Sequence, residues 1–102
     1  MHKHIIYNDK MSFAQSLGKL VKHHRAQVMD QAELALRTGL SRNTISAIEN
    51  GKPTTTEALF AVLAQLNLLH YFSNVVDTQL ALADNRQQRK ARKPKAELSN
   101  DF

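Results

Sequence analysis

The stretch "SRNTISAIENG", residues 41–51, carries side chains that can form hydrogen bonds along one face of a short helix. At about 100° per residue, Ile45 and Ile48 share one apolar face. The opposite face is small and mostly polar, and consists of Asn43, Ser46, Ala47 and Asn50. At its start, Arg42 and Asn43 are the residue types that bond in pairs to the edges of guanine and adenine. The pattern predicts a helix that buries one face and offers the other to a base-bearing surface.

The candidate contacts divide by their position on this helix. Arg42 and Asn43 are the expected base readers, and Ala47 could touch a thymine methyl group. Gln31, at the start of the preceding helix, could hold a phosphate with its amide or with the free N–H groups there. Backbone contacts are expected from Asn50 and Lys52. If the small polar face of residues 43–50 is considered alone, the competing interpretation is an ordinary solvent-exposed face, because asparagine and serine are common there.

Capping signals predict the helices that position this stretch. A first helix begins near Asn8 or Ser12 and fades near residues 25–27. Its expected buried face is Phe13, Leu17, Leu20, Val21 and His24. Asp30 and Glu33 form a capping box for a second helix, which ends at Gly39.

The linker "GLS" separates the second helix from the third by three residues, and Ser41 caps the third helix at residues 42–50. So short a turn makes the two helices cross steeply, which is typical of a helix-turn-helix. Thr54 with Glu57 is expected to cap a fourth helix, which Asn67 can end. Its apolar stripe is Leu59, Val62, Leu63 and Leu66.

These elements predict an all-α bundle of five helices, with a fifth short helix over residues 68–76. Residues 1–8 form an N-terminal arm in which "HIIY" could be a short strand. Residues 9–76 make the helix-turn-helix domain, and residues 77–84 are an ambiguous, weakly helical extension. Residues 85–102 have no apolar period and are predicted to be a basic, disordered tail.

Charge is concentrated at the C-terminal end. The chain has 102 residues and a net charge of +5; residues 1–84 carry 8 basic and 7 acidic residues, and residues 85–102 carry 6 and 2. A basic tail fits nucleic acid, although a solvated charge run is the competing interpretation. No apolar run approaches about 18 residues, so we expect no membrane contact and a cytoplasmic, nucleoid-associated protein.

Catalytic and metal-binding patterns are not found. The chain has no cysteine and only three glycines, and it shows no phosphate-cradling loop and no nucleophile beside a base. His2 and His4 could bind a metal, but two uninvolved histidines in an N-terminal arm are the simpler interpretation. We expect no enzyme activity, no catalytic residue, no metal and no cofactor.

The segment "MDQAELALRTGLSRNTISAIENG" resembles the Cro/C1-type (XRE) helix-turn-helix family, and the similarity extends through "PTTTEALFAVLAQLNL". It covers about residues 11–69. The resemblance implies a lambda-repressor-like DNA-binding domain. Asp30 stands where the family usually has threonine, and Leu36 stands where the family tends to be charged. An apolar residue there could face a partner.

A narrower resemblance is to HipB-like antitoxins, and rests on "IYN", "PTTTEALFAVLAQLNLL" and "RQQRKARKP". It implies a homodimer that represses its own operon from a palindromic operator and restrains a HipA-like serine/threonine kinase toxin. The family's DNA-contacting positions correspond to Gln31, Arg42, Asn43, Thr44, Ser46 and Asn50. No toxin-contacting residue is implied.

Two other functions fit the same residues. One is a stand-alone phage-like or restriction-control repressor without a toxin, and the other is a protein-interaction adaptor that uses the fold without binding an operator. Surplus apolar residues near the fifth helix predict a dimer interface at Leu69, Phe72, Val75 and Val76.

Overall fold

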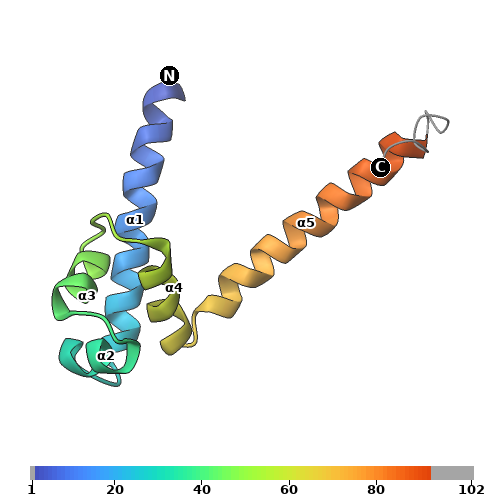
Figure 1. Cartoon of the computed structure of the whole chain (residues 1–102). Helices are drawn as coiled ribbons and strands as arrows, with labels where there is room; N and C mark the ends of the chain where they lie inside the picture. Colours follow the sequence, from blue (N-terminus) through green and yellow to red (C-terminus); the bar gives the residue numbers. More distant parts are fainter. Residues whose placement is uncertain (1, 93–102) are drawn as a thin grey trace. The chain divides into compact units, whose positions relative to one another are not determined.

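A computed structural model describes the backbone of residues 2–92 and the side chains of residues 9–87 (Figure 1). Its five helices are α1 (His2–Ala26), α2 (Gln31–Thr38), α3 (Arg42–Glu49), α4 (Thr56–Gln65) and α5 (Leu69–Arg92). No strand occurs in residues 2–92. The prediction of an all-α fold with five helices and a helix-turn-helix is therefore confirmed.

The chain divides into two compact units, Met1–Leu69 and His70–Phe102. The first, which we call the bundle, contains α1 to α4, and the second is α5 from His70 onward. Residues 70–76, which the predicted domain of residues 9–76 includes, belong to the second unit.

The centre of the bundle takes one side chain from each of its four helices. The four largest fully buried side chains are Val21 of α1, Leu34 of α2, Ile45 of α3 and Val62 of α4. Other buried apolar residues of the bundle include Leu17, Ile48, Leu63 and Leu68. Because α2 and α3 each insert an apolar residue into this centre, the helix-turn-helix is fixed to α1 and α4 and is not an appendage.

Local capping bonds set the ends of α2 and α3 as the sequence predicts. Asp30 accepts a hydrogen bond from the Glu33 backbone N–H at 2.8 Å, and Ser41 accepts one from the Thr44 N–H at 3.1 Å. Gly39 ends α2 at φ 74°, a left-handed conformation that glycine adopts at little cost. The carboxylate of Glu33 does not complete the capping box, because it accepts instead from Arg37 at 2.8 Å.

The cap of α4 lies one residue later than predicted. Thr55, not Thr54, accepts the bond from the Ala58 N–H at 3.1 Å. Residues 54–56 are all threonine, so local chemistry does not choose among them. Packing does, since this register buries Ala58 and Val62. Asn67 follows the helix at φ 58°, as expected of a residue that ends it.

The N-terminal part of the chain differs from the sequence prediction. Residues 2–8 are the first two turns of α1, so the short strand in "HIIY" and the separate arm are wrong. A strand at these residues would need a second strand to pair with, and residues 2–92 contain none. A helix forms its backbone hydrogen bonds within itself.

The buried face of α1 is shorter than predicted. Leu17 and Val21 are buried, but Phe13 is 60% exposed and Leu20 is 37% exposed. Helices α2, α3 and α4 gather around the C-terminal half of α1, and its N-terminal half extends beyond them (Figure 1). Phe13 lies at the edge of the covered part of α1 and is mostly exposed. Leu20 lies on the flank of the buried face, about 100° round from Val21.

Helix α5 is longer than predicted and includes the ambiguous extension, residues 77–84. It also includes residues 85–92, for which disorder was predicted. Arginine, glutamine, lysine and alanine are strong helix formers, so a helix can continue there without an apolar stripe. The rest of the predicted tail, residues 93–102, lies outside the described residues.

No single helix in residues 2–92 is long and apolar enough to cross a membrane, although Thr56–Gln65 and Leu69–Gln87 reach the required length and composition when counted together.

Gly18 brings α1 against the end of α3 and supplies a test of this packing. A methyl group on Gly18 would lie 2.5 Å from the carbonyl oxygen of Ile48 and 2.6 Å from that of Glu49. A glycine-to-alanine change inside a helix ordinarily stabilises by about 1 kcal/mol. Here we expect Gly18→Ala to lower the free energy of unfolding by about 1–3 kcal/mol, because α3 must shift.

Urea unfolding followed by circular dichroism measures this change. Lys19→Ala, at the exposed neighbouring position, is the control and should change stability little. A stabilised Gly18→Ala protein would show that α1 and α3 do not approach this closely.

Candidate nucleic-acid interface

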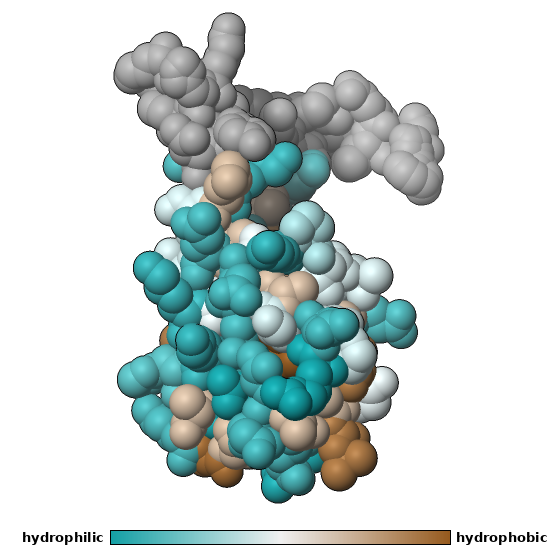
Figure 2. Space-filling view, turned by 90° about the vertical axis from the view of Figure 1, so that its left-hand side faces the viewer, coloured by the Kyte–Doolittle hydropathy of each residue, from teal (hydrophilic) through white to brown (hydrophobic). Residues whose placement is uncertain are grey.

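The α2–turn–α3 unit presents one face of α3 outward. Ile45 and Ile48 are buried, whereas Asn43 and Asn50 are exposed and Ser46 and Ala47 are half-buried. The predicted division of α3 into a buried apolar face and an accessible small face is therefore present. Figure 2 looks onto the side of the bundle where α2 and α3 lie in Figure 1 and shows a mostly hydrophilic surface.

Arg42 and Asn43 occupy the first turn of α3, and both are exposed. Neither side chain forms a hydrogen bond to any residue among those described. Their donors and acceptors are thus free for an external partner. The surface that the sequence singled out is accessible in the bundle.

At the C-terminal end of α3, some hydrogen-bonding groups are already used within the helix and its cap. Asn50 donates from Nδ2 to the Ser46 carbonyl at 2.9 Å and to Ser46 Oγ at 3.3 Å. The Lys52 backbone N–H donates to the Ala47 carbonyl at 2.8 Å, and the Lys52 side chain is exposed. Asn50 keeps its amide oxygen free, while Lys52 keeps its ammonium group.

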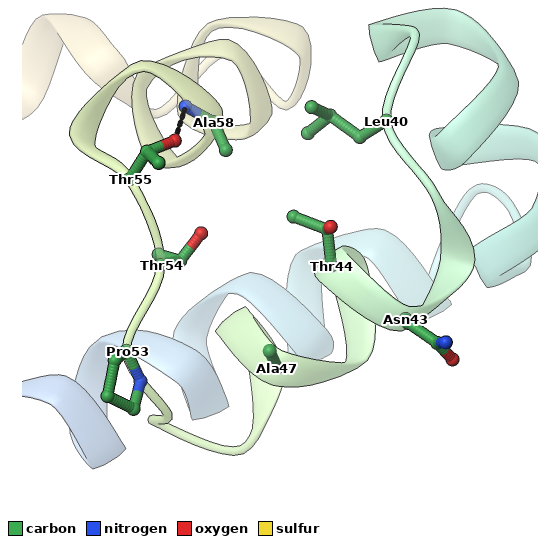
Figure 3. A pocket seen from close by; sticks show the side chains of 8 residues that line it. All are labelled: Leu40, Asn43, Thr44, Ala47, Pro53, Thr54, Thr55 and Ala58. Carbon is green, nitrogen blue, oxygen red and sulfur yellow. Dashed lines mark hydrogen bonds between the residues drawn. The ribbon is translucent and has the colours of Figure 1, made fainter.

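Thr44 lies apart from this stripe. Its hydroxyl is 3.0 Å from that of Ser41, and it lines a shallow hollow of about 410 Å³ between α3, residues 53–55 and α4. Leu40, Thr44, Thr54 and Ala58 point into this space, whereas Asn43 lies at the rim with its amide outward (Figure 3). The hollow thus lies between the Pro53 loop and the first turn of α3.

A buried ion pair that was not predicted from the sequence joins α1 to α3 behind the candidate interface. Arg25, at the end of α1, is 8% exposed, and Glu49, in the last turn of α3, is 6% exposed. The guanidinium donates from Nε to Glu49 Oε2 at 2.5 Å and from Nη2 to Glu49 Oε1 at 3.1 Å. Its Nη1 donates to the Met29 carbonyl at 3.0 Å. The hydrogen bond to Glu49 raises the pKa of Arg25, so the guanidinium stays charged.

Gln31 joins this pair to the interface. Its Nε2 donates to Glu49 Oε1 at 3.0 Å. A carboxylate only accepts hydrogen bonds, so this contact fixes which end of the Gln31 amide faces inward. One N–H and the amide oxygen remain for a partner at the start of α2. The phosphate contact expected of Gln31 stays a prediction.

Residue periodicity could have revealed the pair. On α3, Glu49 falls four residues after Ile45, on the apolar face; on α1, Arg25 falls four residues after Val21. Two opposite charges on faces that must be buried are expected to meet, because an unpaired buried charge is costly.

Residues 25–70 match the family model described as helix-turn-helix. The matched segment begins at Arg25 and contains α2, α3 and α4 with their turns. Over these residues the match supports the broader of the two resemblances and suggests a DNA-binding transcription regulator. No curated protein and no solved structure matches the chain.

The ion pair generates a stability prediction. Arg25→Met leaves the Glu49 carboxylate buried with Gln31 as its remaining side-chain partner, so we expect a loss of about 3–5 kcal/mol. The double change Arg25→Met with Glu49→Leu removes both charges and should recover most of that loss.

Urea unfolding of the two variants and the unchanged protein measures both effects. Arg37→Met is the matched control, because Arg37 and its partner Glu33 are exposed and the pair contributes about 0.3–0.5 kcal/mol. A double variant as unstable as Arg25→Met would show that the orphaned carboxylate is not the cause.

Proposed function

We propose that the chain is a sequence-specific repressor that inserts α3 into the major groove of double-stranded DNA. The observation that carries the proposal is the outer face of α3, which is accessible, small and polar while its inner face is buried. The major groove is about 12 Å wide and accepts a helix only if the side chains between helix and bases are short. Ser46 and Ala47 meet that condition at the middle of α3.

Base reading falls to the first turn of α3. Arg42 can bond in pairs to guanine, and Asn43 to adenine, because both side chains have unused hydrogen-bonding groups. Ala47 offers a methyl contact to thymine. These three residues would supply the discrimination between sequences.

Positioning on the phosphate backbone falls to the edges of the same surface. Gln31 has a free N–H beside the first amides of α2, Thr44 has its hydroxyl, and Lys52 has an exposed ammonium group. Asn50 has fewer free groups, since its Nδ2 serves α3. Residues 1–84 have a net charge of only +1, so these few contacts and the basic C-terminal end supply the attraction to phosphates.

Two copies would bind one operator. A two-fold homodimer places its recognition helices in successive major grooves, about 34 Å apart, and so reads a palindrome. A protein with this activity works where the chromosome is, at the nucleoid.

Arg42 and Asn43 give the test of base reading. Arg42→Ala and Asn43→Ala should each weaken binding to the preferred site by about 1–3 kcal/mol, roughly 5- to 150-fold, because a paired base contact is lost. Binding to unrelated duplex should persist, since phosphate contacts remain.

Fluorescence anisotropy measures both affinities, on the duplex that the unchanged protein selects from a random pool and on a shuffled duplex. Lys22→Ala, which removes an exposed cation from α1, is the control for lost charge. Equal weakening on both duplexes would rule out base reading.

We further propose that the repressor is the antitoxin of a HipA-like serine/threonine kinase and regulates the operon that encodes both. What supports this step is the sequence resemblance at "PTTTEALFAVLAQLNLL" and the basic segment after it. The exposed Leu36 of α2, where the family tends to be charged, is a candidate partner contact.

Isolation of the tagged chain from its native cell tests the kinase. We expect a serine/threonine kinase in near-equal amount, identified by mass spectrometry, and retained after nuclease treatment. Leu36→Glu should release the kinase and keep operator binding. Recovery of the chain with DNA and without a kinase would contradict the antitoxin role and support a stand-alone repressor.

A further inference from the structure

A groove lies where the C-terminal ends of α1, α2 and α4 meet, outside the proposed DNA contacts. It has a volume of about 290 Å³, and its lining includes His24, Val28, Met29, Arg37, Leu66 and Asn67. None of these residues belongs to the predicted base-reading or phosphate-contacting set. Ligand pockets usually have volumes of roughly 300–1,000 Å³, so this groove suits a few side chains and not a large cofactor.

Part of the lining is apolar. Val28, in the loop after α1, is 69% exposed, and Met29 beside it is half-buried. Leu66, at the end of α4, is buried beneath the groove. An apolar side chain placed here would remove Val28 from water, which stabilises by about 25 cal/mol for each Å² covered.

The rest of the lining is cationic or neutral and includes no carboxylate. Arg37 uses Nε to donate to Glu33 at 2.8 Å, and its Nη1 and Nη2 form no hydrogen bond to another described residue. A guanidinium binds a carboxylate strongly when two of its nitrogens can donate together. Asn67 adds an exposed amide. The groove therefore fits an occupant that has both carboxylates and apolar side chains.

One wall of the groove belongs to the network of buried charges. Met29 lines the groove, and its carbonyl accepts a hydrogen bond from Arg25 Nη1 at 3.0 Å. The backbone N–H groups of Val28 and Met29 in turn donate to the Arg25 carbonyl, each at 2.9 Å. An occupant that packs against Val28 and Met29 would therefore hold the loop that binds Arg25, without touching the proposed DNA contacts.

The C-terminal end of the sequence has the composition that the groove requires. Residues 85–95 carry 6 basic and no acidic residues, whereas residues 96–102, "AELSNDF", carry 2 acidic and no basic residues. Glu97 and Asp101 are the carboxylates, and Leu98 and Phe102 are the large apolar side chains. The sign of the charge thus changes within the predicted basic tail. We call residues 96–102 the acidic segment.

The acidic segment of the same copy is too far along the chain to fill the groove. Helix α5 begins two residues after Asn67 and has 24 residues, so it is about 36 Å long. The six residues from Arg92 to Leu98 span at most about 21 Å. Leu98 therefore cannot return to the start of α5, whereas the acidic segment of a second copy has no such limit.

We propose that the acidic segment of one copy docks in the groove of a second copy. Leu98 and Phe102 would cover Val28, and a carboxylate of the segment would bind the Nη atoms of Arg37. The docking requires no DNA and so goes beyond the proposed function. It also differs from the predicted dimer contact, whose residues all lie on α5, namely Leu69, Phe72, Val75 and Val76.

Disulfide trapping tests the docking on the full chain, which has no cysteine of its own. One copy carries Val28→Cys in the groove, and a separately prepared copy carries Asn100→Cys in the acidic segment. Mild oxidation of the mixture should join the two variants, as measured by mass spectrometry. Phe60→Cys is the matched control, because Phe60 is 52% exposed and does not line the groove. It should give about 10-fold less mixed disulfide, since docking raises the local concentration of the two thiols only at Val28→Cys.

Charge exchange between the two copies gives a second readout. Arg37→Glu on the Val28→Cys copy should lower the yield of mixed disulfide by about 10-fold, because it sets like charges against each other. Glu97→Lys with Asp101→Lys on the other copy should restore the yield. A change that only disturbed the bundle would not be restored by substitutions in the other copy.

Three outcomes would overturn the docking. One is equal trapping by Val28→Cys and Phe60→Cys, and another is a yield that does not respond to Arg37→Glu. The third is a disulfide within a single chain that carries both Val28→Cys and Asn100→Cys, because it would show that the segment of the same copy fills the groove. Trapping is measured without DNA, so its result is independent of whether the chain binds an operator.

Discussion

The buried pair of Arg25 and Glu49 is the interaction on which the geometry of the proposed DNA-binding surface depends. It joins the end of α1 to the last turn of α3, and Gln31 extends it to the first turn of α2. Two charges removed from water are tolerated only when each meets its full set of partners. Here the guanidinium also reaches the Met29 carbonyl. The network therefore favours one relative placement of the ends of α1, α2 and α3, because any other placement would leave a buried charge without a partner.

Helix α3 works under two opposed requirements. Its inner face buries Ile45 and Ile48 in the bundle, and the proposed entry into the major groove requires short side chains on its outer face. Gly18 adds a limit from α1, because its missing side chain lets α1 come against the carbonyl groups at the end of α3. The eight residues of α3 must meet these three requirements together. This explains why its small residues are grouped on one side.

Features set by neighbouring residues could be predicted from the sequence, and those set by distant contacts could not. The caps at Asp30 and Ser41 and the left-handed Gly39 depend on local chemistry, so they were predictable. The prediction of Thr54 as the cap of α4 was wrong because three adjacent threonines are locally equivalent. The predicted burial of Phe13 was wrong because periodicity does not show where the rest of the bundle stops, and the predicted burial of Leu20 was wrong because this residue lies on the flank of the buried face. The ion pair of Arg25 and Glu49 joins residues 24 apart. Periodicity places each of them on a buried face, but it does not show that the two faces meet. Helix propensity, more than apolar period, explains the length of α5.

The free side chains at Arg42 and Asn43 have an evolutionary consequence. Residues that hold no other part of the molecule in place can be exchanged without loss of the scaffold. If Arg42 and Asn43 read bases as proposed, relatives descended from one ancestor could therefore acquire new target sequences by substitution at these two positions, while the interior stays unaltered. The residues proposed to determine the target sequence are thus separate from the buried residues that stabilise the bundle, and the former can change without loss of the fold.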